Sequence, residues 1–359
     1  MESQKREISV VGLGYIGLPT AVVLAQAGHH VKGYDVKKEV RERLAGGHIH
    51  IVENQLQEAF SAVHQSGALT ITDTLETSDV YILCVPTPFL DGEEKRADLS
   101  YVQSAGKLVA GVLKEGDLVI LESTVPPYTT QMLTKLLAEE SGLRADQFYT
   151  AHCPERVLPG RILYELEHND RIIGSQDPVA AAMTKDLYES FVKEGTCLVC
   201  DDVTAEMCKL VENTYRDINI AFANQLSEIC DTAGIGVHQL ISLANRHPRV
   251  NILTPGPGVG GHCLAVDPWF LVERFKEEAS LIREARVIND NKPLWVMNKI
   301  EEALEGDTSK TIAILGMAYK PDIDDMRESP SLHLAHALKE KGYTVIGCEP
   351  NTDAKELEG

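Results

Sequence analysis

One cysteine lies at the end of a glycine-rich stretch and has titratable neighbours. Four glycines fall between residues 256 and 261, Cys263 follows them with His262 directly before it, and Asp267 comes four positions later. Most unpaired cysteines are small buried hydrophobes, which do not need such a stretch. Close approach of the backbone to a ligand does favour glycine, so the pattern predicts a nucleophilic thiol. A thiol can add to an aldehyde to form a thiohemiacetal, which loses a hydride to give a thioester that water cleaves.

A second motif, GLGYIG at residues 12–17, lies between an apolar strand at 8–11 and an alanine-rich helix. A GxGxxG sequence alone is weak evidence, but this position between strand and helix is typical of a dinucleotide-binding turn. Gly12 would permit the tight turn, Gly14 would let a pyrophosphate approach backbone amides, and Gly17 would let helix and strand pack closely.

The identity of the dinucleotide is indicated by Asp35. This residue directly follows the expected second strand at 30–34 and lies eighteen positions past Gly17. Its carboxylate would accept hydrogen bonds from ribose hydroxyls and would repel a 2′-phosphate, which favours NAD over NADP. A hydride acceptor alone takes an alcohol to an aldehyde. Together with a thiol, it predicts oxidation of an alcohol to a carboxylate in one site.

Further strand-like runs at 81–85, 117–121 and 148–151 alternate with helical segments, which predicts a parallel, doubly wound sheet. Ligands of such sheets lie beyond the carboxyl ends of the strands. The polar residues that follow these three strands are Thr87, residues 122–124 and residues 152–156. Each could be an ordinary helix cap, but three at one edge of the sheet favour a shared site beside the cofactor.

A helical pattern then runs without a break from about residue 204 to residue 233. Lys209, Asn213 and Arg216 are spaced i, i+4 and i+7, so they share one face of this helix. Such a stripe is often simply solvated. A helix of about 45 Å that joins two domains usually buries most of its circumference, however, and a buried lysine there would suit proton transfer or oxyanion stabilisation.

Composition limits the class of partner. The chain has 359 residues, with 34 Lys and Arg against 54 Asp and Glu and a net charge of −20, which argues against a nucleic-acid or membrane partner. No apolar run approaches a membrane span, and the N-terminus lacks the apolar region of a secretory signal. Eight scattered cysteines, including a single CxxC motif at Cys197 and Cys200, are typical of a reduced protein. We therefore expect a cytoplasmic protein without a metal site.

Five separated motifs resemble, in the same order, those of the nucleotide-sugar 6-dehydrogenases. They are residues 11–35, residues 122–127, the pair Lys209 and Asn213, residues 260–267 and residues 320–327. The resemblance covers essentially the whole chain, and it is specific because the motifs are far apart.

The resemblance implies an α/β protein with three domains. An N-terminal Rossmann domain at residues 1–200 would bind NAD, and a central long-helix domain at 201–305 would carry dimerisation and catalysis. Residues 306–359 would form a C-terminal Rossmann-like domain that binds the UDP-sugar. Only two strands and one helix are expected there, so that domain is expected to be truncated.

Two motifs favour an aminosugar-type member of the family: RVLPG at 156–160 and HCLAVDPW at 262–269. UDP-glucose types carry an aromatic residue after the Pro-Glu pair and a Ser-Cys-Phe run at the thiol. The resemblance thus implies NAD-dependent oxidation of the C6 hydroxyl of UDP-N-acetyl-D-mannosamine to the uronate. UDP-N-acetylglucosamine or UDP-glucose 6-dehydrogenases, a two-electron β-hydroxyacid dehydrogenase and a non-catalytic NAD sensor are the alternatives.

The resemblance also implies roles for individual residues. Cys263 would be the nucleophile, Lys209 would stabilise oxyanions or shuttle a proton, and Glu155 would assist thioester hydrolysis. Asp267 and a water near Thr124 would help to remove the alcohol proton, which makes the expected catalytic set Cys263, Lys209, Asp267, Glu155, Thr124 and Asn213. The expected cofactor contacts are Gly12, Gly14, Tyr15, Ile16, Gly17, Asp35, Thr87, Thr124 and Arg327.

The expected substrate contacts are Arg156, Val157, Lys209, Asn213, Arg216, His247, Arg249, Gly260, Tyr319 and Lys320. These place basic groups of an acidic protein around a diphosphate, where guanidinium contacts are strongest. His247 and Arg249 would reach the substrate of a neighbouring subunit in a homodimer or higher homo-oligomer. For Arg156, pairing with a nearby acid such as Glu165 or Asp170 is the alternative.

Overall fold

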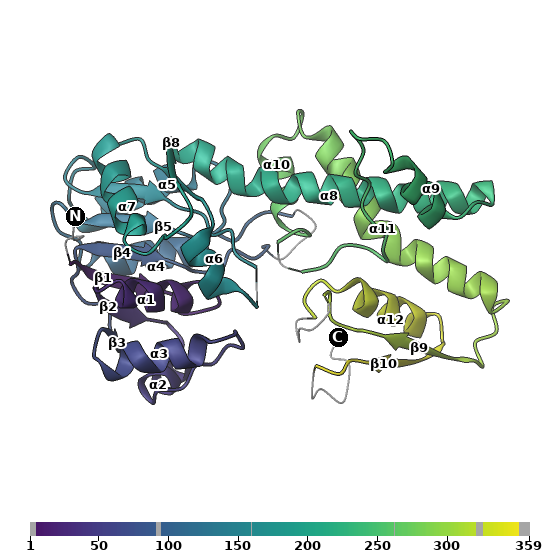
Figure 1. The fold of residues 1–359 in the computed structure, drawn as a ribbon, viewed down its shortest axis with the longest axis horizontal. Helices are drawn as coiled ribbons and strands as arrows, with labels where there is room; N and C mark the ends of the chain where they lie inside the picture. The colour runs from purple at the N-terminus through teal and green to yellow at the C-terminus, as the bar shows by residue number, and fades with distance from the viewer. Residues whose placement is uncertain (1–4, 91–94, 159, 262, 321–325, 352–359) are drawn as a thin grey trace. The chain divides into compact units, whose positions relative to one another are not determined.

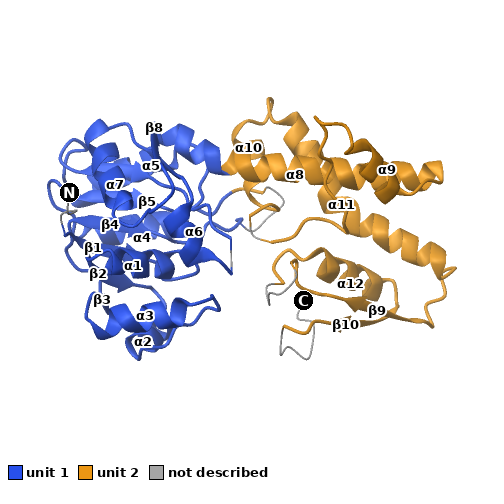
Figure 2. Cartoon of the chain, in the orientation of Figure 1, with its two compact units in different colours: residues 1–90, 97–209 blue, residues 91–96, 210–359 orange. Residues whose placement is uncertain are grey.

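The computed structural model describes residues 5–90, 95–158, 160–261, 263–320 and 326–351 (Figure 1). The chain divides into two compact units, residues 1–90 with 97–209 and residues 91–96 with 210–359 (Figure 2).

The first unit is built on one eight-stranded sheet with the strand order β3-β2-β1-β4-β5-β6-β7-β8. Neighbouring strands pair in parallel, except β6 and β7, which are antiparallel. The strands are β1 Glu7–Val11, β2 His30–Tyr34, β3 Leu69–Ile71, β4 Val80–Leu83, β5 Leu118–Leu121, β6 Tyr149–His152, β7 Arg171–Gly174 and β8 Cys197–Cys200. The predicted doubly wound α/β sheet is confirmed.

Helices cover both faces of this sheet, because its central strands are apolar throughout and need cover on each side. One buried cluster includes Leu18, Val22 and Phe60, and a second, on other helices, includes Val102 and Leu133. The helices are α1 Gly17–Gln26, α2 Lys38–Ala45, α3 Leu56–Gln65, α4 Ser100–Ala110, α5 Thr129–Ser141, α6 Ile162–His168 and α7 Pro178–Glu189.

The register aligns the ends of the three strands that the sequence singled out. Leu83 of β4 pairs with Leu121 of β5, which pairs with His152 of β6. The segments that follow these strands therefore leave the sheet at one edge, as predicted.

The long helix α8 spans Asp202–Ala233, close to the predicted 204–233. Near its start, the buried Glu206 carboxylate accepts hydrogen bonds from the backbone N–H groups of Tyr128 (2.6 Å) and Thr130 (2.7 Å) and from the Thr130 hydroxyl (2.7 Å). These donors lie at the N-terminus of α5, whose first N–H groups have no partner within the helix. Glu206 thus joins α8 to α5.

In the described residues, the second unit contains the rest of α8, four further helices and a small parallel sheet. The helices are α9 Val237–Ala244, α10 Asp267–Arg274, α11 Ser280–Ala303 and α12 Pro330–Glu340, and the strands are β9 Thr311–Leu315 and β10 Thr344–Cys348. The predicted strand-helix-strand unit is confirmed, with the Ser329 hydroxyl accepting from the backbone N–H of Leu332 at the start of α12. No helix in the described ranges has both the length and the apolar character needed to cross a bilayer.

The Glu206 cap predicts a pH dependence of stability. Burial raises the pKa of Glu206 from 4.5 to about 7, so between these values the folded state holds a proton that the unfolded state releases. Its contribution to the free energy of unfolding is greatest below pH 4.5 and is lost as the pH rises to 7, by about 3 kcal/mol in total. Urea unfolding between pH 4.5 and 8 should therefore show a flatter slope for Glu206→Gln than for the wild type. Glu139→Gln, at an exposed acid of α5, should keep the wild-type slope; equal slopes for all three proteins would contradict the assignment.

Candidate active site

The glycine turn after β1 has the backbone that a dinucleotide fingerprint requires. Gly12 adopts φ +90°, and a Cβ there would lie 2.5 Å from the carbonyl oxygen of Cys84. A Cβ on Gly17 would lie 1.8 Å from the carbonyl oxygen of Gly12. Both positions are therefore restricted to glycine by the close packing of turn, strand and helix.

Gly14 differs from its neighbours, because a Cβ there would meet no heavy atom within 4 Å. Packing inside the protein therefore does not explain this glycine, whereas the approach of a ligand to the backbone does. The N-cap of α1, Ile16, supplies no side-chain hydrogen bond to the helix N-terminus. An uncapped helix N-terminus beside open backbone fits the diphosphate of a dinucleotide.

Asp35 lies half-buried directly after β2, beside this turn. Its Oδ2 accepts from the backbone N–H of Leu13 (2.9 Å), and its Oδ1 accepts from that of Lys37 (2.9 Å). Each carboxylate oxygen has a second lone pair, so ribose hydroxyls can still donate to it. Of the other predicted cofactor residues in this unit, Tyr15 is exposed and Ile16 is half-buried.

The loops after β4 and β5 are bonded to each other. The Thr87 hydroxyl donates to the carbonyl oxygen of Thr124 (2.7 Å), and the Ser123 hydroxyl donates to that of Val85 (2.7 Å). The structure thus brings together Thr87 and Thr124, both predicted to contact the cofactor.

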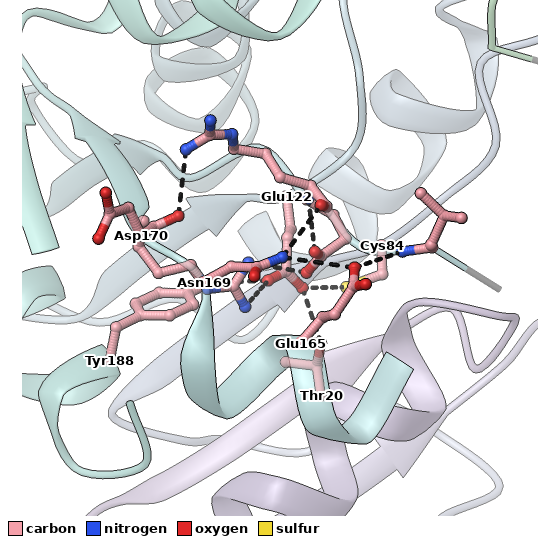
Figure 3. Close-up of polar contacts among 11 residues, drawn as sticks. Thr20, Cys84, Glu122, Glu165, Asn169, Asp170 and Tyr188 are labelled. Atoms are coloured by element: carbon pink, nitrogen blue, oxygen red, sulfur yellow. Dashed lines mark hydrogen bonds and ion pairs between the residues drawn. The ribbon is translucent and has the colours of Figure 1, made fainter. Parts of the chain in front are cut away.

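Glu155, after β6, belongs to a buried charge cluster that also includes Glu122, which is labelled in Figure 3. Nη1 of Arg171 donates to one oxygen of Glu155 at 2.7 Å, and the other oxygen accepts from the backbone N–H of Arg156. Arg171, on β7, is 1% exposed and also lies 3.6 Å from a carboxylate oxygen of Glu122. Glu155 is therefore held as the partner of a buried cation, which the sequence analysis missed. An arginine inside an otherwise apolar strand was the available signal.

Glu122 is the second carboxylate of this cluster, and it accepts hydrogen bonds from three neutral donors. They are the hydroxyls of Thr20 (3.2 Å) and Tyr188 (3.1 Å) and the thiol of Cys84 (3.0 Å). Burial raises the pKa of Glu122 and raises the pKa of Cys84 well above its usual value, so Cys84 stays a thiol that donates. The cluster gives Cys84 a structural role.

Arg156 lies half-buried in the loop after β6. Its Nη1 donates to the backbone carbonyl of Asp170 (3.2 Å), and Glu165 accepts from the N–H of Leu158 (2.8 Å) in the same loop. These bonds support the alternative in which Arg156 holds the loop. Val157 packs against the apolar core of the first unit.

The thiol lies on a turn that leads into α10. The carbonyl oxygen of Cys263 accepts from the backbone N–H groups of Val266 (3.0 Å) and Asp267 (2.8 Å). Asp267 is 3% exposed, and its Oδ2 accepts from Nδ2 of Asn213 on α8 at 2.6 Å. The structure therefore brings three predicted catalytic residues together at this turn, with Asn213 and Asp267 buried and Cys263 half-buried. His262 lies outside the described residues.

Three of the glycines before the thiol pack closely against other parts of the chain, which the sequence did not predict. A Cβ on Gly260 would lie 2.6 Å from the carbonyl oxygen of Glu328, and one on Gly261 would lie 2.7 Å from the ring of Tyr319. At Gly258, which has φ +144°, it would lie 3.1 Å from Pro330. Packing within the chain therefore accounts for glycine at these three positions, and the approach of a ligand to them stays a prediction.

This packing brings predicted substrate and cofactor residues to the thiol turn. Besides the Tyr319 contact, the N–H of Gly261 donates to the carbonyl oxygen of Arg327 (3.1 Å). The side chain of Arg327 is exposed, and Lys320 is half-buried.

The remaining predicted residues lie on α8 and in the loop after α9. Lys209 is half-buried and Arg216 is exposed, so α8 does not bury the whole of the predicted stripe. His247 and Arg249 are both exposed, with the N–H of Arg249 donating to Nδ1 of His247 at 3.4 Å.

The parallel sheet, the glycine turn and the acid after β2 define an NAD-binding oxidoreductase. Comparison of the sequence with protein families identifies which one: the chain belongs to the UDP-glucose/GDP-mannose dehydrogenase family. Residues 6–192 match the NAD binding domain of that family, residues 203–291 its central domain and residues 313–359 its UDP binding domain.

Individual relatives cover most of the chain. An NDP-N-acetyl-D-galactosaminuronic acid dehydrogenase of Ralstonia nicotianae is 49% identical, over 96% of this chain and 83% of the relative. A UDP-N-acetyl-D-mannosamine dehydrogenase of Escherichia coli is 47% identical, over 96% and 85%. The solved structure of a UDP-D-ManNAc dehydrogenase from Pyrococcus horikoshii superposes with a TM-score of 0.90 at 45% identity, covering 95% of this chain and 82% of that one.

Two glycine substitutions should separate packing from NAD binding. Gly14→Ala places its methyl group in open space, so the Tm should not change, while NAD affinity should fall about tenfold as one or two phosphate hydrogen bonds weaken. Gly17→Ala forces its Cβ against Gly12 and should cost about 1–3 kcal/mol of stability. Calorimetric unfolding and NAD titration measure the two effects. Unchanged NAD affinity in a folded Gly14→Ala protein would contradict the placement of the diphosphate.

Proposed function

We propose that this chain oxidises the C6 hydroxyl of UDP-N-acetyl-D-mannosamine to the carboxylate, with two molecules of NAD as hydride acceptors. The observation that carries the proposal is the buried Asn213–Asp267 hydrogen bond beside the Cys263 turn, since a two-electron dehydrogenase has no use for a thiol held in this way. The names of the two relatives at 47% and 45% identity support the aminosugar substrate.

NAD supplies the hydride acceptor, and the residues of the glycine turn and Asp35 would hold it. In the proposed first half-reaction, Asp267 and a water near Thr124 help to remove the proton of the C6 hydroxyl as the aldehyde forms. Asn213 keeps the Asp267 carboxylate in place for that step through its 2.6 Å hydrogen bond.

In the second half-reaction, the Cys263 thiolate forms a C–S bond with the aldehyde carbon, and the carbonyl oxygen becomes an alkoxide that Lys209 stabilises. Loss of the second hydride leaves a thioester. Water then attacks the carbonyl carbon with the help of Glu155, the C–S bond breaks, and the products are the carboxylate and the free thiol.

The sugar itself has a second candidate, because a relative named for NDP-N-acetyl-D-galactosaminuronic acid is 49% identical to this chain. Arg156 and Val157, together with Arg216, Gly260, Tyr319 and Lys320, are the proposed contacts to the UDP-sugar. Oxidation of UDP-N-acetylgalactosamine in preference to the mannosamine isomer would select this second candidate.

A panel of UDP-sugars with measurement of NADH released per sugar tests the function. We expect two NADH per UDP-N-acetylmannosamine and much lower efficiency on UDP-glucose. Cys263→Ser should bind NAD normally but abolish net oxidation to the uronate, because a serine hydroxyl is a poor nucleophile at neutral pH. Two NADH per sugar from that variant would contradict the covalent mechanism.

The same panel separates the two roles of Arg156. A charge-assisted contact to the substrate is worth about 1.5–3 kcal/mol, so Arg156→Ala should cut kcat/KM by about ten- to a hundredfold. Normal kinetics with a lowered Tm would instead favour the alternative in which Arg156 holds its loop, for example through the bond to the carbonyl oxygen of Asp170.

We also propose a homodimer in the cytoplasm, in which His247 and Arg249 reach the partner's substrate. Tyr215, Phe222 and Ile229 lie seven residues apart on α8 and are 68%, 50% and 56% exposed. Apolar residues at this spacing form a stripe that pairs with the same helix of a second copy. The eight free cysteines support a reducing compartment.

Analytical ultracentrifugation tests the assembly. Phe222→Asp buries a carboxylate in the proposed interface, which should cost roughly 3 kcal/mol and raise the dimer Kd about a hundredfold. Val52→Asp, at a residue 82% exposed in the first unit, is the matched control. An unchanged dimer Kd in both variants would contradict the proposed interface on α8.

A further inference from the structure

We infer that Arg286 is a positioning residue for the Cys263 turn: it fixes the peptide that follows the thiol through a hydrogen bond to the carbonyl oxygen of Leu264. Its catalytic consequence rests on the proposed function, but its effect on the thiol does not. Nothing in the sequence motifs singled out this arginine.

The contacts of Arg286 link two helices to the turn. It lies on α11 and is 0% exposed. Its Nη1 donates to Leu264 O (3.3 Å) and to Oδ1 of Asp217 on α8 (2.5 Å), and its Nη2 pairs with Asp290. Since Leu264 directly follows Cys263, this bond acts on the backbone next to the sulfur.

Arg286 is one of three side chains of α8 and α11 that bond to the described part of the segment from the glycines to α10. At one end, Oδ1 of Asn224 accepts from the N–H of Gly256 (2.8 Å); at the other, Asn213 donates to Asp267 (2.6 Å). Arg286 supplies the anchor between them.

Asn289 connects the Arg286–Asp217 pair and Asn224 in one buried network. Its Nδ2 donates to Asp217 Oδ1 (2.8 Å), and its Oδ1 accepts from Asn224 Nδ2 (2.9 Å). Asn213, Asp217 and Asn224 stand at i, i+4 and i+11 on α8, so one face of that helix supports the whole segment.

Stability alone is a weak reason for this network. A buried ion pair can often be replaced by apolar residues without loss of stability, because the desolvation of two charges offsets their attraction. A bond from a planar guanidinium to both a carboxylate and a backbone carbonyl fixes geometry instead, since the five donors of arginine have fixed directions. Displacement of a reacting group by about 1 Å can cost on the order of a hundredfold in rate.

The experiment compares Arg286→Met/Asp217→Asn with Lys292→Met. The double variant removes both charges of the pair and the donor to Leu264, while the amide oxygen that replaces the Asp217 carboxylate can still accept from Asn289. Lys292 is a matched control: it lies on the same helix, is 2% exposed, and donates to Asn224, Ser227 and Glu228 of α8.

The measurements are the rate of iodoacetamide alkylation at Cys263, resolved by peptide mass spectrometry; kcat and KM for the UDP-sugar; NAD affinity; and the Tm. We expect the double variant to lose about ten- to a hundredfold in kcat, with an altered alkylation rate and little change in KM or in NAD affinity. Lys292→Met should keep kcat and the alkylation rate within about twofold of the wild type, even where its Tm falls by as much as that of the double variant.

Wild-type kcat and alkylation in the double variant would overturn the inference, as would an equal loss in Lys292→Met. Should the double variant not fold, Arg286→Lys keeps the test decisive. The three donors of an ammonium lie on one rotating atom, so they cannot hold the fixed directions in which the guanidinium bonds Asp217, Asp290 and Leu264, and kcat should fall in a folded protein. A wild type that oxidises none of the UDP-sugars would refute the proposed function, while the alkylation rates would still decide the role of Arg286.

Discussion

The hydrogen bonds that buried polar residues of α8 make to other segments are the constraint on which the rest of this protein depends. Glu206 holds the N-terminus of α5 in the first unit, and Asn213 holds Asp267 beside the thiol turn in the second. An unsatisfied buried polar group costs about 1–3 kcal/mol, so each of these side chains fixes its partner strongly. One continuous helix thus carries the anchors of both the nucleotide-binding sheet and the thiol.

Charge is handled in the same way in both units. In the first, Arg171 lies between Glu155 and Glu122, and in the second, Arg286 lies between Asp217 and Asp290. Each arginine is buried and pairs with two carboxylates. Arg171 bonds the predicted catalytic residue Glu155, and Arg286 bonds the backbone next to Cys263. Acidic residues outnumber basic ones in this protein, whose net charge is −20. Each of these two buried arginines can therefore bond two carboxylates, and its charge-assisted hydrogen bonds fix the geometry around it.

The sequence predicted the sheet, the long helix and the terminal strand-helix-strand unit because each depends on local periodicity and on nearby turns. It also located Asp35 and the Asn213 and Asp267 pair by motif. It could not predict the buried arginines, because the partners of Arg171 and Arg286 lie on other elements. It also could not predict the packing against Gly258, Gly260 and Gly261, since the residues that pack on them, from Tyr319 onward, lie far along the chain. Contacts between residues far apart in the sequence do not alter the local residue pattern from which elements and motifs are predicted.

The chain contains eight cysteines, so a covalent mechanism must select one of them. Burial raises the pKa of Cys84 and of Cys153 well above the usual range, and raises that of Cys197 and of Cys200 to about 11. These four remain thiols at neutral pH, and only the thiolate is a strong nucleophile. Cys263 differs in its setting: it is half-buried, on a turn whose carbonyl caps the start of α10 and whose backbone is tied to α8 and α11. Burial thus keeps four of the seven other cysteine sulfurs protonated, which favours Cys263 as the nucleophile of the proposed mechanism.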